Sequence, residues 1–159
     1  MTAELRIEAA DPQSAQALAL LREAAVEVRA MYPELQAQRH PSLWPTNPPV
    51  APRGAYFLGR MNGQVVASGA LRPIDERTVE LRRMYVHTDH RKRGIARAML
   101  RRLETEAGAL GYGLIRLETG YKQEAAMALY HACGFRAIAP FGEYANDPTS
   151  RCFEKEVGK

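Results

Sequence analysis

The chain has 159 residues, of which 46% are hydrophobic and 25% charged, with a formal net charge of +4 at pH 7. This size and composition are typical of one globular domain with its own core, so we expect residues 1–159 to form a single domain. No apolar run approaches the roughly 18 residues that cross a membrane, and the first residues do not resemble a signal peptide, so we expect a cytosolic protein without a membrane partner. The positive charge permits an anionic partner but does not require nucleic acid.

The first third of the chain combines a strand, a helix and a long loop. Alternation from Leu5 to Ala9 predicts a strand. Asp11 and Pro12 then provide a cap and a first-turn proline for a helix that runs to about Ala30. Six prolines between positions 33 and 53 remove backbone donors, which predicts a long loop of the kind that is functional or mobile.

The rest of the chain alternates strands with helices. Asn62-Gly63 is a strong turn signal and predicts a hairpin of strands over 55–60 and 64–71. The remaining patterns predict strands over 78–87, 114–119, 135–139 and 151–157, and helices from Ile95 to about Gly111 and over 123–133. Strands and helices mixed in this way indicate an α+β sandwich.

Cysteine and histidine do not form a metal-binding pattern. Cys133 and Cys152 show no metal-ligand spacing with the four histidines, so we expect no metal. We interpret both cysteines as reduced packing residues, although the sequence leaves a disulfide open.

A basic turn lies between the strand over 78–87 and the helix that follows it. Arg91, Lys92 and Arg93 precede Gly94 and the first apolar helical residue, Ile95. Unpaired amides and the positive end of the helix dipole meet at such a helix start, which suits a phosphate or diphosphate. A solvated basic turn that only joins two elements is the alternative interpretation.

Three segments together resemble one family. Arg91-Lys92-Arg93-Gly94-Ile95-Ala96 is similar to the Q/R-x-x-G-x-G/A signature of the GCN5-related N-acetyltransferases. Residues 80–86 resemble the fourth strand of that family, and residues 126–135 resemble its A-x-x-L-Y-x-x-x-G-F segment. The resemblance is specific over about 78–139. It implies a three-layer α/β/α fold with a mixed, mostly antiparallel central sheet.

The resemblance also implies acetyl-CoA as co-substrate. The turn would bind its diphosphate. The backbone amides of Met84 and Val86 would donate hydrogen bonds to the thioester oxygen, and the same segment would pair with the pantetheine arm. Gln123 stands where the family often has asparagine. The residues expected to bind acetyl-CoA are Met84, Tyr85, Val86, Arg91, Lys92, Arg93, Gly94, Ile95, Ala96, Arg97, Gln123 and Tyr130.

Two residues are candidates for proton transfer. The resemblance places the hydroxyl of Tyr130 near the thioester sulfur, where it would protonate the leaving thiolate; otherwise Tyr130 is a core tyrosine. Glu80 lies at the separation from Arg91 where histone-type members carry a general base, although Arg82 beside it makes an ion pair the alternative. Regular strand alternation would put Glu80, Arg82, Met84 and Val86 on one face.

The acceptor pocket is less well defined. By resemblance it is shaped by residues 32–53 and 141–150, and no single residue there is singled out. The candidates for its lining are His40, Trp44, Phe141, Glu143 and Tyr144. Glu118 and Thr119 end the strand over 114–119 and would face the acceptor side in this layout, with an ordinary strand end as the alternative.

The leading hypothesis is an N-acetyltransferase that acts on a primary amine of a small molecule by direct attack in a ternary complex. One alternative is a non-catalytic acetyl-CoA sensor. Another is nucleic-acid binding through the basic residues between 91 and 102. A homodimer is compatible with the resemblance, which does not decide the oligomeric state.

Overall fold

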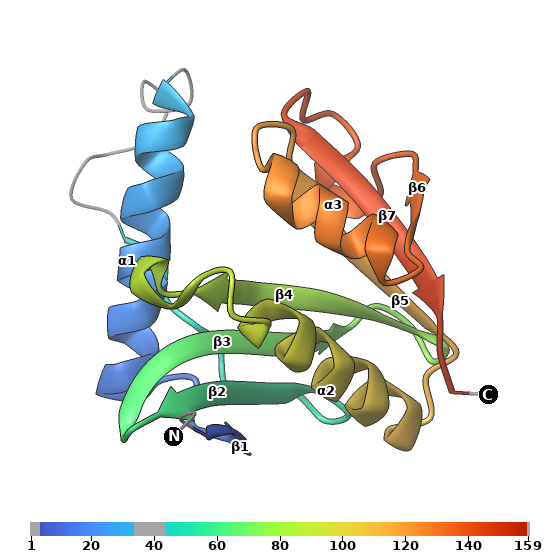
Figure 1. The fold of residues 1–159 in the computed structure, drawn as a ribbon. Coiled ribbons are helices and arrows are strands. Elements are labelled where there is room, and N and C mark those ends of the chain that lie inside the picture. Colours follow the sequence, from blue (N-terminus) through green and yellow to red (C-terminus); the bar gives the residue numbers. More distant parts are fainter. Residues whose placement is uncertain (1–3, 34–43, 159) are drawn as a thin grey trace.

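The computed structural model describes residues 4–33 and 44–158. In this part of the chain a seven-stranded sheet has the order β1-β2-β3-β4-β5-β7-β6, and every neighbouring pair is antiparallel except β4 and β5 (Figure 1). The strands are β1 (Leu5–Ala9), β2 (Ala55–Met61), β3 (Gln64–Pro73), β4 (Thr78–Val86), β5 (Leu114–Gly120), β6 (Arg136–Ile138) and β7 (Ser150–Glu156). The helices are α1 (Ala15–Met31), α2 (Ile95–Ala109) and α3 (Glu124–Ala132).

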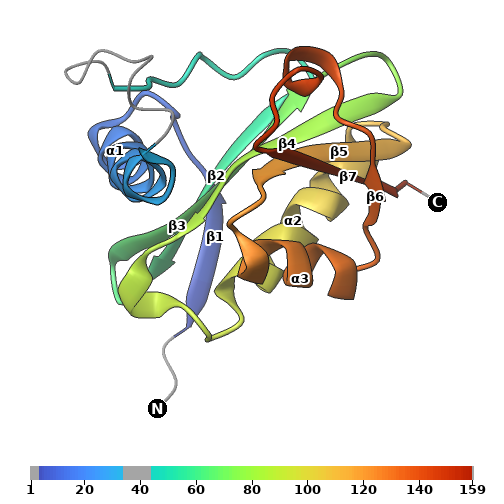
Figure 2. The same cartoon turned by 90° about the horizontal axis from the view of Figure 1, so that it is seen from above.

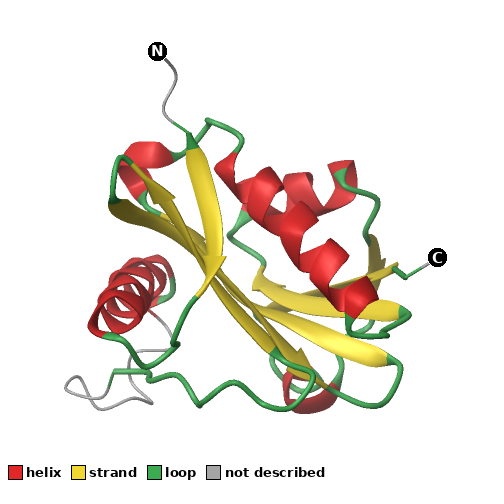
Figure 3. Ribbon diagram, turned by 90° about the horizontal axis from the view of Figure 1, so that it is seen from below, coloured by secondary structure: helices red, strands yellow, loops and turns green. Residues whose placement is uncertain are grey.

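The helices cover the sheet from both sides. Figures 2 and 3 show α1 on one face and α2 with α3 on the other, so the molecule has three layers, α/β/α. The expected α+β class with a mostly antiparallel central sheet is confirmed. None of the helices in the described ranges combines the length and apolar character that a bilayer crossing requires.

Helix α1 begins three residues later than its first cap signal predicts. Ser14 is the N-cap, and its side-chain oxygen accepts a hydrogen bond from the amide of Ala17 at 3.2 Å. Asp11 instead accepts from the amide of Gln13 within the preceding turn. The prediction that Asp11 and Pro12 start the helix is therefore wrong, because an ST-type cap nearer to the first apolar residue competes successfully.

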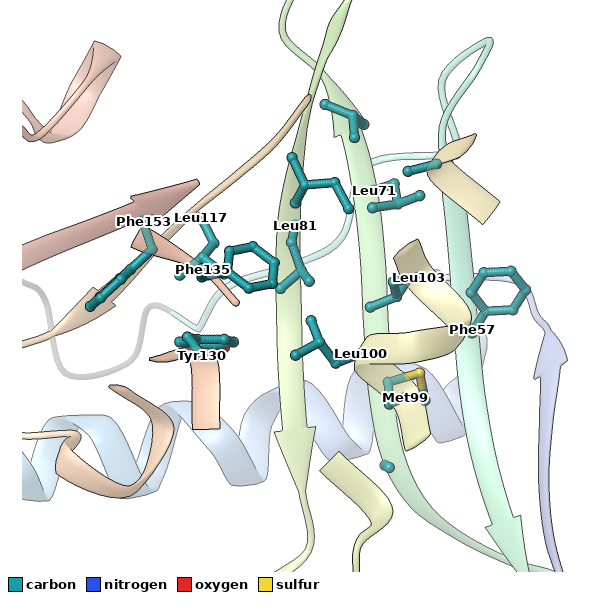
Figure 4. Close-up of a cluster of buried hydrophobic side chains, with 14 of the residues drawn as sticks. Phe57, Leu71, Leu81, Met99, Leu100, Leu103, Leu117, Tyr130, Phe135 and Phe153 are labelled. Atoms are coloured by element: carbon teal, nitrogen blue, oxygen red, sulfur yellow. The ribbon is translucent and has the colours of Figure 1, made fainter. Parts of the chain in front are cut away.

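The main core lies between the sheet and the α2–α3 layer. Figure 4 shows Met99, Leu100 and Leu103 of α2 against the strands, and Tyr130 of α3 among aromatic side chains. A smaller cluster on the other face joins α1 to the sheet; its buried members are Ala17, Leu20, Tyr56 and Leu58. Each face of the sheet is thus fixed independently, which holds the strands rigid where they approach the site.

Strand β4 contains a bulge. Ser68 of β3 pairs with Tyr85 and Ala70 pairs with Arg82, so β4 has one more residue than β3 in this interval. Arg83 has a φ of 58°, in the left-handed region. The extra residue resets the alternation of side chains, as bulges do.

The expectation that Glu80, Arg82, Met84 and Val86 share a face is wrong for its last two members. Met84 and Val86 pack into the main core. Tyr85 packs against the α1 cluster. Regular alternation predicts faces correctly only up to the bulge, because one inserted residue inverts every later position.

Candidate active site

Strands β4 and β5 separate in the middle of the sheet. They pair only along Thr78–Leu81 and Leu114–Leu117, after which β4 continues to Val86 and β5 to Gly120 (Figure 1). Beyond the last pair, the strand edges that face one another have no ladder partner across the opening. Such edges present backbone donors and acceptors to whatever enters between them.

The backbone of β4 directs two amides to this opening. The amide of His87 donates to the carbonyl of Val66 on β3 at 2.8 Å, so His87 faces β3. Successive residues of a strand point their backbone groups to opposite edges, which sends the amides of Met84 and Val86 away from β3. The carbonyl of Val86 accepts from Arg91 Nε at 3.0 Å, consistent with this orientation.

The basic turn presents a row of unpaired amides at the start of α2. Lys92 and Gly94 both have positive φ, 63° and 79°. No group in residues 4–33 and 44–158 accepts a hydrogen bond from the amides of Lys92, Arg93 or Gly94, and α2 has no side-chain cap. A Cβ placed on Gly94 would meet no atom within 4 Å. The turn thus has the open space and the donors that a diphosphate requires.

The basic side chains of the turn are not equivalent. Arg91 forms two hydrogen bonds of 2.7 Å with the carboxylate of Glu27 on α1, and this pairing lowers the pKa of Glu27. Lys92, Arg93 and Arg97 are exposed. Arg91 therefore fastens the turn to α1. Its amide also donates to the carbonyl of Thr88 at 3.4 Å, so among the described residues the free donors of the turn are the amides of residues 92–94 and not the groups of Arg91.

Ile95 and Ala96 are placed by packing. The side chain of Ile95 is 3% exposed and belongs to the main core, and Ala96 packs against the same cluster. These two residues hold the first turn of α2 against the sheet, so that their backbone and not their side chains faces the turn.

Tyr130 is buried in α3 beside the opening. Its ring centroid lies 5.7 Å from that of Phe135 and 6.1 Å from that of Phe153 (Figure 4). Its hydroxyl makes no hydrogen bond with any group in the described ranges. Burial raises its pKa well above the ordinary value for a phenol, with a smaller contribution from the negative charge of Glu118. The phenol therefore keeps its proton at neutral pH and is able to donate it.

Gln123 is folded back on its own turn. Its carbonyl oxygen accepts from the hydroxyl of Thr119 at 3.0 Å and from the amide of Gly120 at 2.9 Å. This caps the end of β5 and leaves the amide nitrogen as the group with which Gln123 could contact a pantetheine arm.

Glu80 is the centre of a charged network. Its side chain is 3% exposed; Oε1 accepts from Arg72 at 2.7 Å, and Oε2 accepts from the hydroxyl of Tyr144 at 2.6 Å and from Arg82 at 3.5 Å. Both guanidinium groups also contact Glu143. The ion pair between Glu80 and Arg82, which the sequence offers as the alternative to a general-base role, is present. Tyr144, from the loop before β7, adds a hydrogen bond to Glu80.

A pocket of about 130 Å³ opens above this network, at the point where β4 and β5 separate. Its lining residues are Glu80, Leu81, Arg82, Arg83, Glu118 and Tyr144. Burial raises the pKa of Glu118, while a 2.6 Å hydrogen bond from the Ser150 hydroxyl acts in the opposite direction. Glu118 therefore holds a proton more readily than an exposed carboxylate does.

Sequence reasoning missed two lining residues, Leu81 and Arg83, and of these Arg83 is the charged one. Regular alternation would have turned it toward the apolar core, and a cation at such a position is itself a signal of a bulge. Its neighbours on β4, Val79 and Leu81, do lie in that core.

The other acceptor-side candidates divide between the site and the periphery. Phe141 packs edge-on against Tyr144 with centroids 5.4 Å apart. The guanidinium groups of Arg22 and Arg29 of α1 both contact the ring of Trp44, which is not among the residues that line the 130 Å³ pocket. His40 lies outside the described residues.

A larger pocket of about 500 Å³ lies between α1 and the β2–β3 hairpin. Tyr130, Gly94 and Glu118 are absent from its lining, so it has no part in the chemistry argued above. Within the described ranges no group of three metal-binding side chains lies together, and Cys133 and Cys152 are free thiols.

Comparison with known proteins points in one direction. The model of the acetyltransferase (GNAT) family matches residues 18–135. The IAA acetyltransferase of Azospirillum brasilense is 40% identical over 103 residues, which are 64% of this chain and 67% of that protein. Seven further curated relatives are matched over 34% to 64% of their own length.

Solved structures extend the similarity to nearly the whole chain. A Klebsiella pneumoniae structure designated an acyl-CoA N-acyltransferase is similar with a TM-score of 0.77 and 28% identity, covering 96% of this chain and 97% of that one. An acetyltransferase of Elizabethkingia anophelis, solved with acetyl-CoA bound, has the same fold with a TM-score of 0.66 and 18% identity, covering 96% and 98% of the two chains.

Proposed function

The chain belongs to the acetyltransferase (GNAT) family, and we propose that it transfers an acetyl group from acetyl-CoA to a primary amine of a small molecule, by direct attack in a ternary complex. The observation that carries the proposal is the combination of the open edge of β4 with the unpaired amides before α2. One end of this surface suits a diphosphate, and the other brings backbone donors and a neutral phenol to one place. Relatives solved with acetyl-CoA support the same co-substrate here.

The chain supplies each element that acetyl transfer needs. The amides of Lys92, Arg93 and Gly94 bind the diphosphate, while Met84 and Val86 donate to the oxygen that gains negative charge as the amine adds to the carbonyl carbon. The carbon–nitrogen bond forms, the carbon–sulfur bond breaks, and Tyr130 gives its proton to the departing thiolate.

The ammonium group of the acceptor must lose a proton before attack, and two carboxylates, Glu80 and Glu118, line the pocket at the opening. Glu80 is the residue that the family resemblance predicts, but its oxygens already accept hydrogen bonds from Arg72, Arg82 and Tyr144. Glu118 has one such donor among the described residues, Ser150, and burial raises its pKa, which makes it a stronger base than an exposed carboxylate. We therefore propose Glu118 as the base and Glu80 as the anchor that holds the two arginines in place.

Two measurements test the proposed function. Calorimetry of the purified chain should detect acetyl-CoA binding that survives moderate salt. A thiol-release assay over amino acids, polyamines, aminoglycosides and peptides should then find an acceptor. Binding without turnover of any amine would favour the sensor, and nucleic-acid affinity that falls steeply with salt, in the absence of acetyl-CoA binding, would favour the basic-surface alternative.

A further inference from the structure

The position of Arg83 is unusual in three respects. It occupies the extra residue of the β4 bulge, its φ is 58°, and its side chain is only partly exposed. A non-glycine residue in this region of φ costs free energy, and such residues are concentrated at functional sites. Arg83 is one of the residues that line the 130 Å³ pocket at the separation of β4 and β5.

The described residues that accept hydrogen bonds from the Arg83 side chain are neutral. Its Nε donates to Asn47 Oδ1 at 2.9 Å, and its Nη2 donates to the carbonyl of Thr46 at 3.3 Å. No carboxylate in the described ranges forms an ion pair with it. Buried Asn47 is in turn fixed by a 2.8 Å hydrogen bond to the carbonyl of Pro12. Among the described residues, neutral groups thus orient the guanidinium, and none accepts a hydrogen bond from Nη1.

The neighbouring charges do not compensate for Arg83. Arg72 and Arg82 are balanced by the carboxylates of Glu80 and Glu143, which both of them contact. Burial, together with the positive charges of Arg82 and Arg72, lowers the pKa of Arg83. A half-buried cation among other cations is stabilised by any anion that enters the pocket.

From this arrangement we propose that the acceptor carries a carboxylate beside its primary amine, as an amino acid does, and that Arg83 binds that carboxylate. The inference rests on the proposed function and names its substrate class. Glu118 lines the same pocket and meets the ammonium group. Neither Arg83 nor Glu118 forms an ion pair with another described residue, so this cation and this carboxylate match the two charges of a zwitterion. A volume of about 130 Å³ corresponds to roughly four water molecules, enough for the charged end of such an acceptor.

The transfer balances with these residues. Glu118 takes one proton from the ammonium group, and the amine nitrogen then bonds to the thioester carbonyl carbon as the carbon–sulfur bond breaks. Tyr130 gives its proton to the thiolate, and the second proton lost by nitrogen restores the phenol through water. Glu118 releases its proton to solvent, so the products are an N-acetyl amino acid, free thiol and one proton.

Matched acceptor pairs test the inference. Each amino acid is compared with its own carboxamide, which keeps the amine and side chain and lacks the negative charge. We expect kcat/KM to be about 10- to 100-fold higher for the acid, the range that a hydrogen-bonded charge pair supplies. Arg83→Gln should abolish this preference mainly through KM for the acid, and Arg83→Lys should restore part of it. Arg6→Gln, an exposed arginine on β1, removes the same charge elsewhere and should leave the preference unchanged.

The outcomes separate the two proposals. If the wild-type chain acetylates carboxamides as well as acids, or binds acetyl-CoA but acetylates no acid, the inference is wrong while the coenzyme site stands. If acetyl-CoA does not bind, the proposed function itself is wrong. If Arg83→Gln does not fold, judged by circular dichroism, the Arg83→Lys variant and the wild-type acid-to-amide ratio still decide the matter.

Discussion

Replacing Tyr130 by phenylalanine separates chemistry from structure unusually well in this chain. The ring would keep its contacts with Phe135 and Phe153, and the lost hydroxyl has no hydrogen-bond partner among the described residues. We therefore expect the free energy of unfolding to change by less than about 0.5 kcal/mol. A loss of rate in this variant would then report the proton that the phenol supplies.

The size of that loss follows from general acid catalysis. Removing a positioned proton donor lowers kcat by about 100- to 10,000-fold, which corresponds to roughly 3–5 kcal/mol of transition-state stabilisation. The dissociation constant of acetyl-CoA should stay within about threefold of wild type, since the diphosphate contacts lie at the other end of the site. Burial raises the pKa of Tyr130, so the phenol stays protonated and its ionisation should not appear in the pH dependence of kcat below pH 9 or so.

Tyr112→Phe is the matched control. Tyr112 is also buried, but its hydroxyl donates to the carbonyl of Arg53 at 2.9 Å, away from the opening. We expect this variant to lose about 1 kcal/mol of stability with kcat unchanged. Steady-state thiol release, calorimetry with acetyl-CoA and urea denaturation of both variants give the three readouts. An unchanged kcat in Tyr130→Phe would refute the proton-donor assignment.

Three further changes test other parts of the site. Gly94→Ala should weaken acetyl-CoA binding about tenfold or more in calorimetry, because a Cβ would occupy the open space at the turn. Gly63→Ala is its control, since Gly63 has a similar φ of 77° and equally open surroundings. Both variants should lose roughly 1 kcal/mol of stability, and only Gly94→Ala should lose affinity for acetyl-CoA. A general base must be deprotonated, so kcat/KM should rise with pH as Glu118 loses its proton. Because burial raises the pKa of Glu118, this rise should occur at higher pH than for an exposed carboxylate. Glu118→Gln should abolish the rise, and Glu80→Gln should retain it. A raised folded-state pKa also means that the stability contributed by Glu118 is present at low pH and lost as pH rises, so the advantage of Glu118→Gln in urea denaturation should grow toward neutral pH. Gly69→Ala should cost about 1–3 kcal/mol of stability in the same assay, since its Cβ would lie 2.7 Å from Leu103 Cδ1.

Sequence patterns were sufficient for most of the fold. Apolar periodicity and turn residues locate the hairpin at Asn62-Gly63 and the strands and helices to within two residues at most ends, because these signals are local. The end of α2 near Gly111 and the start of α3 after Gln123 follow from the same kind of signal. The cap of α1 was misplaced because Asp11 and Ser14 both satisfy the local pattern and only packing selects between them.

The site was predictable where the backbone forms it, and less so where side chains meet. A motif of six residues locates the turn before α2, but Arg91 turns out to pair with Glu27, a residue 64 positions away. Of the partners of Glu80, only Arg82 is near enough in the sequence to be predicted; Arg72 of β3 and Tyr144 before β7 are connected to it by no sequence spacing. Long-range charge pairing depends on the register of the whole sheet, and a local pattern does not contain it.

The bulge at Arg83 explains why backbone and side chains of β4 take different roles. One added residue turns Met84 and Val86 into the core, which leaves their amides as the groups that face the opening. Because of the bulge, Arg83 and Arg82 both line the acceptor pocket, whereas in a regular strand their side chains would point to opposite faces of the sheet. A substitution that removed the bulge would therefore be expected to disturb the oxyanion donors and the acceptor pocket together. Deleting Arg83, compared with Arg83→Gln, tests this coupling: the deletion should lower kcat for carboxamide acceptors as well as acids, whereas the substitution should affect the acids alone.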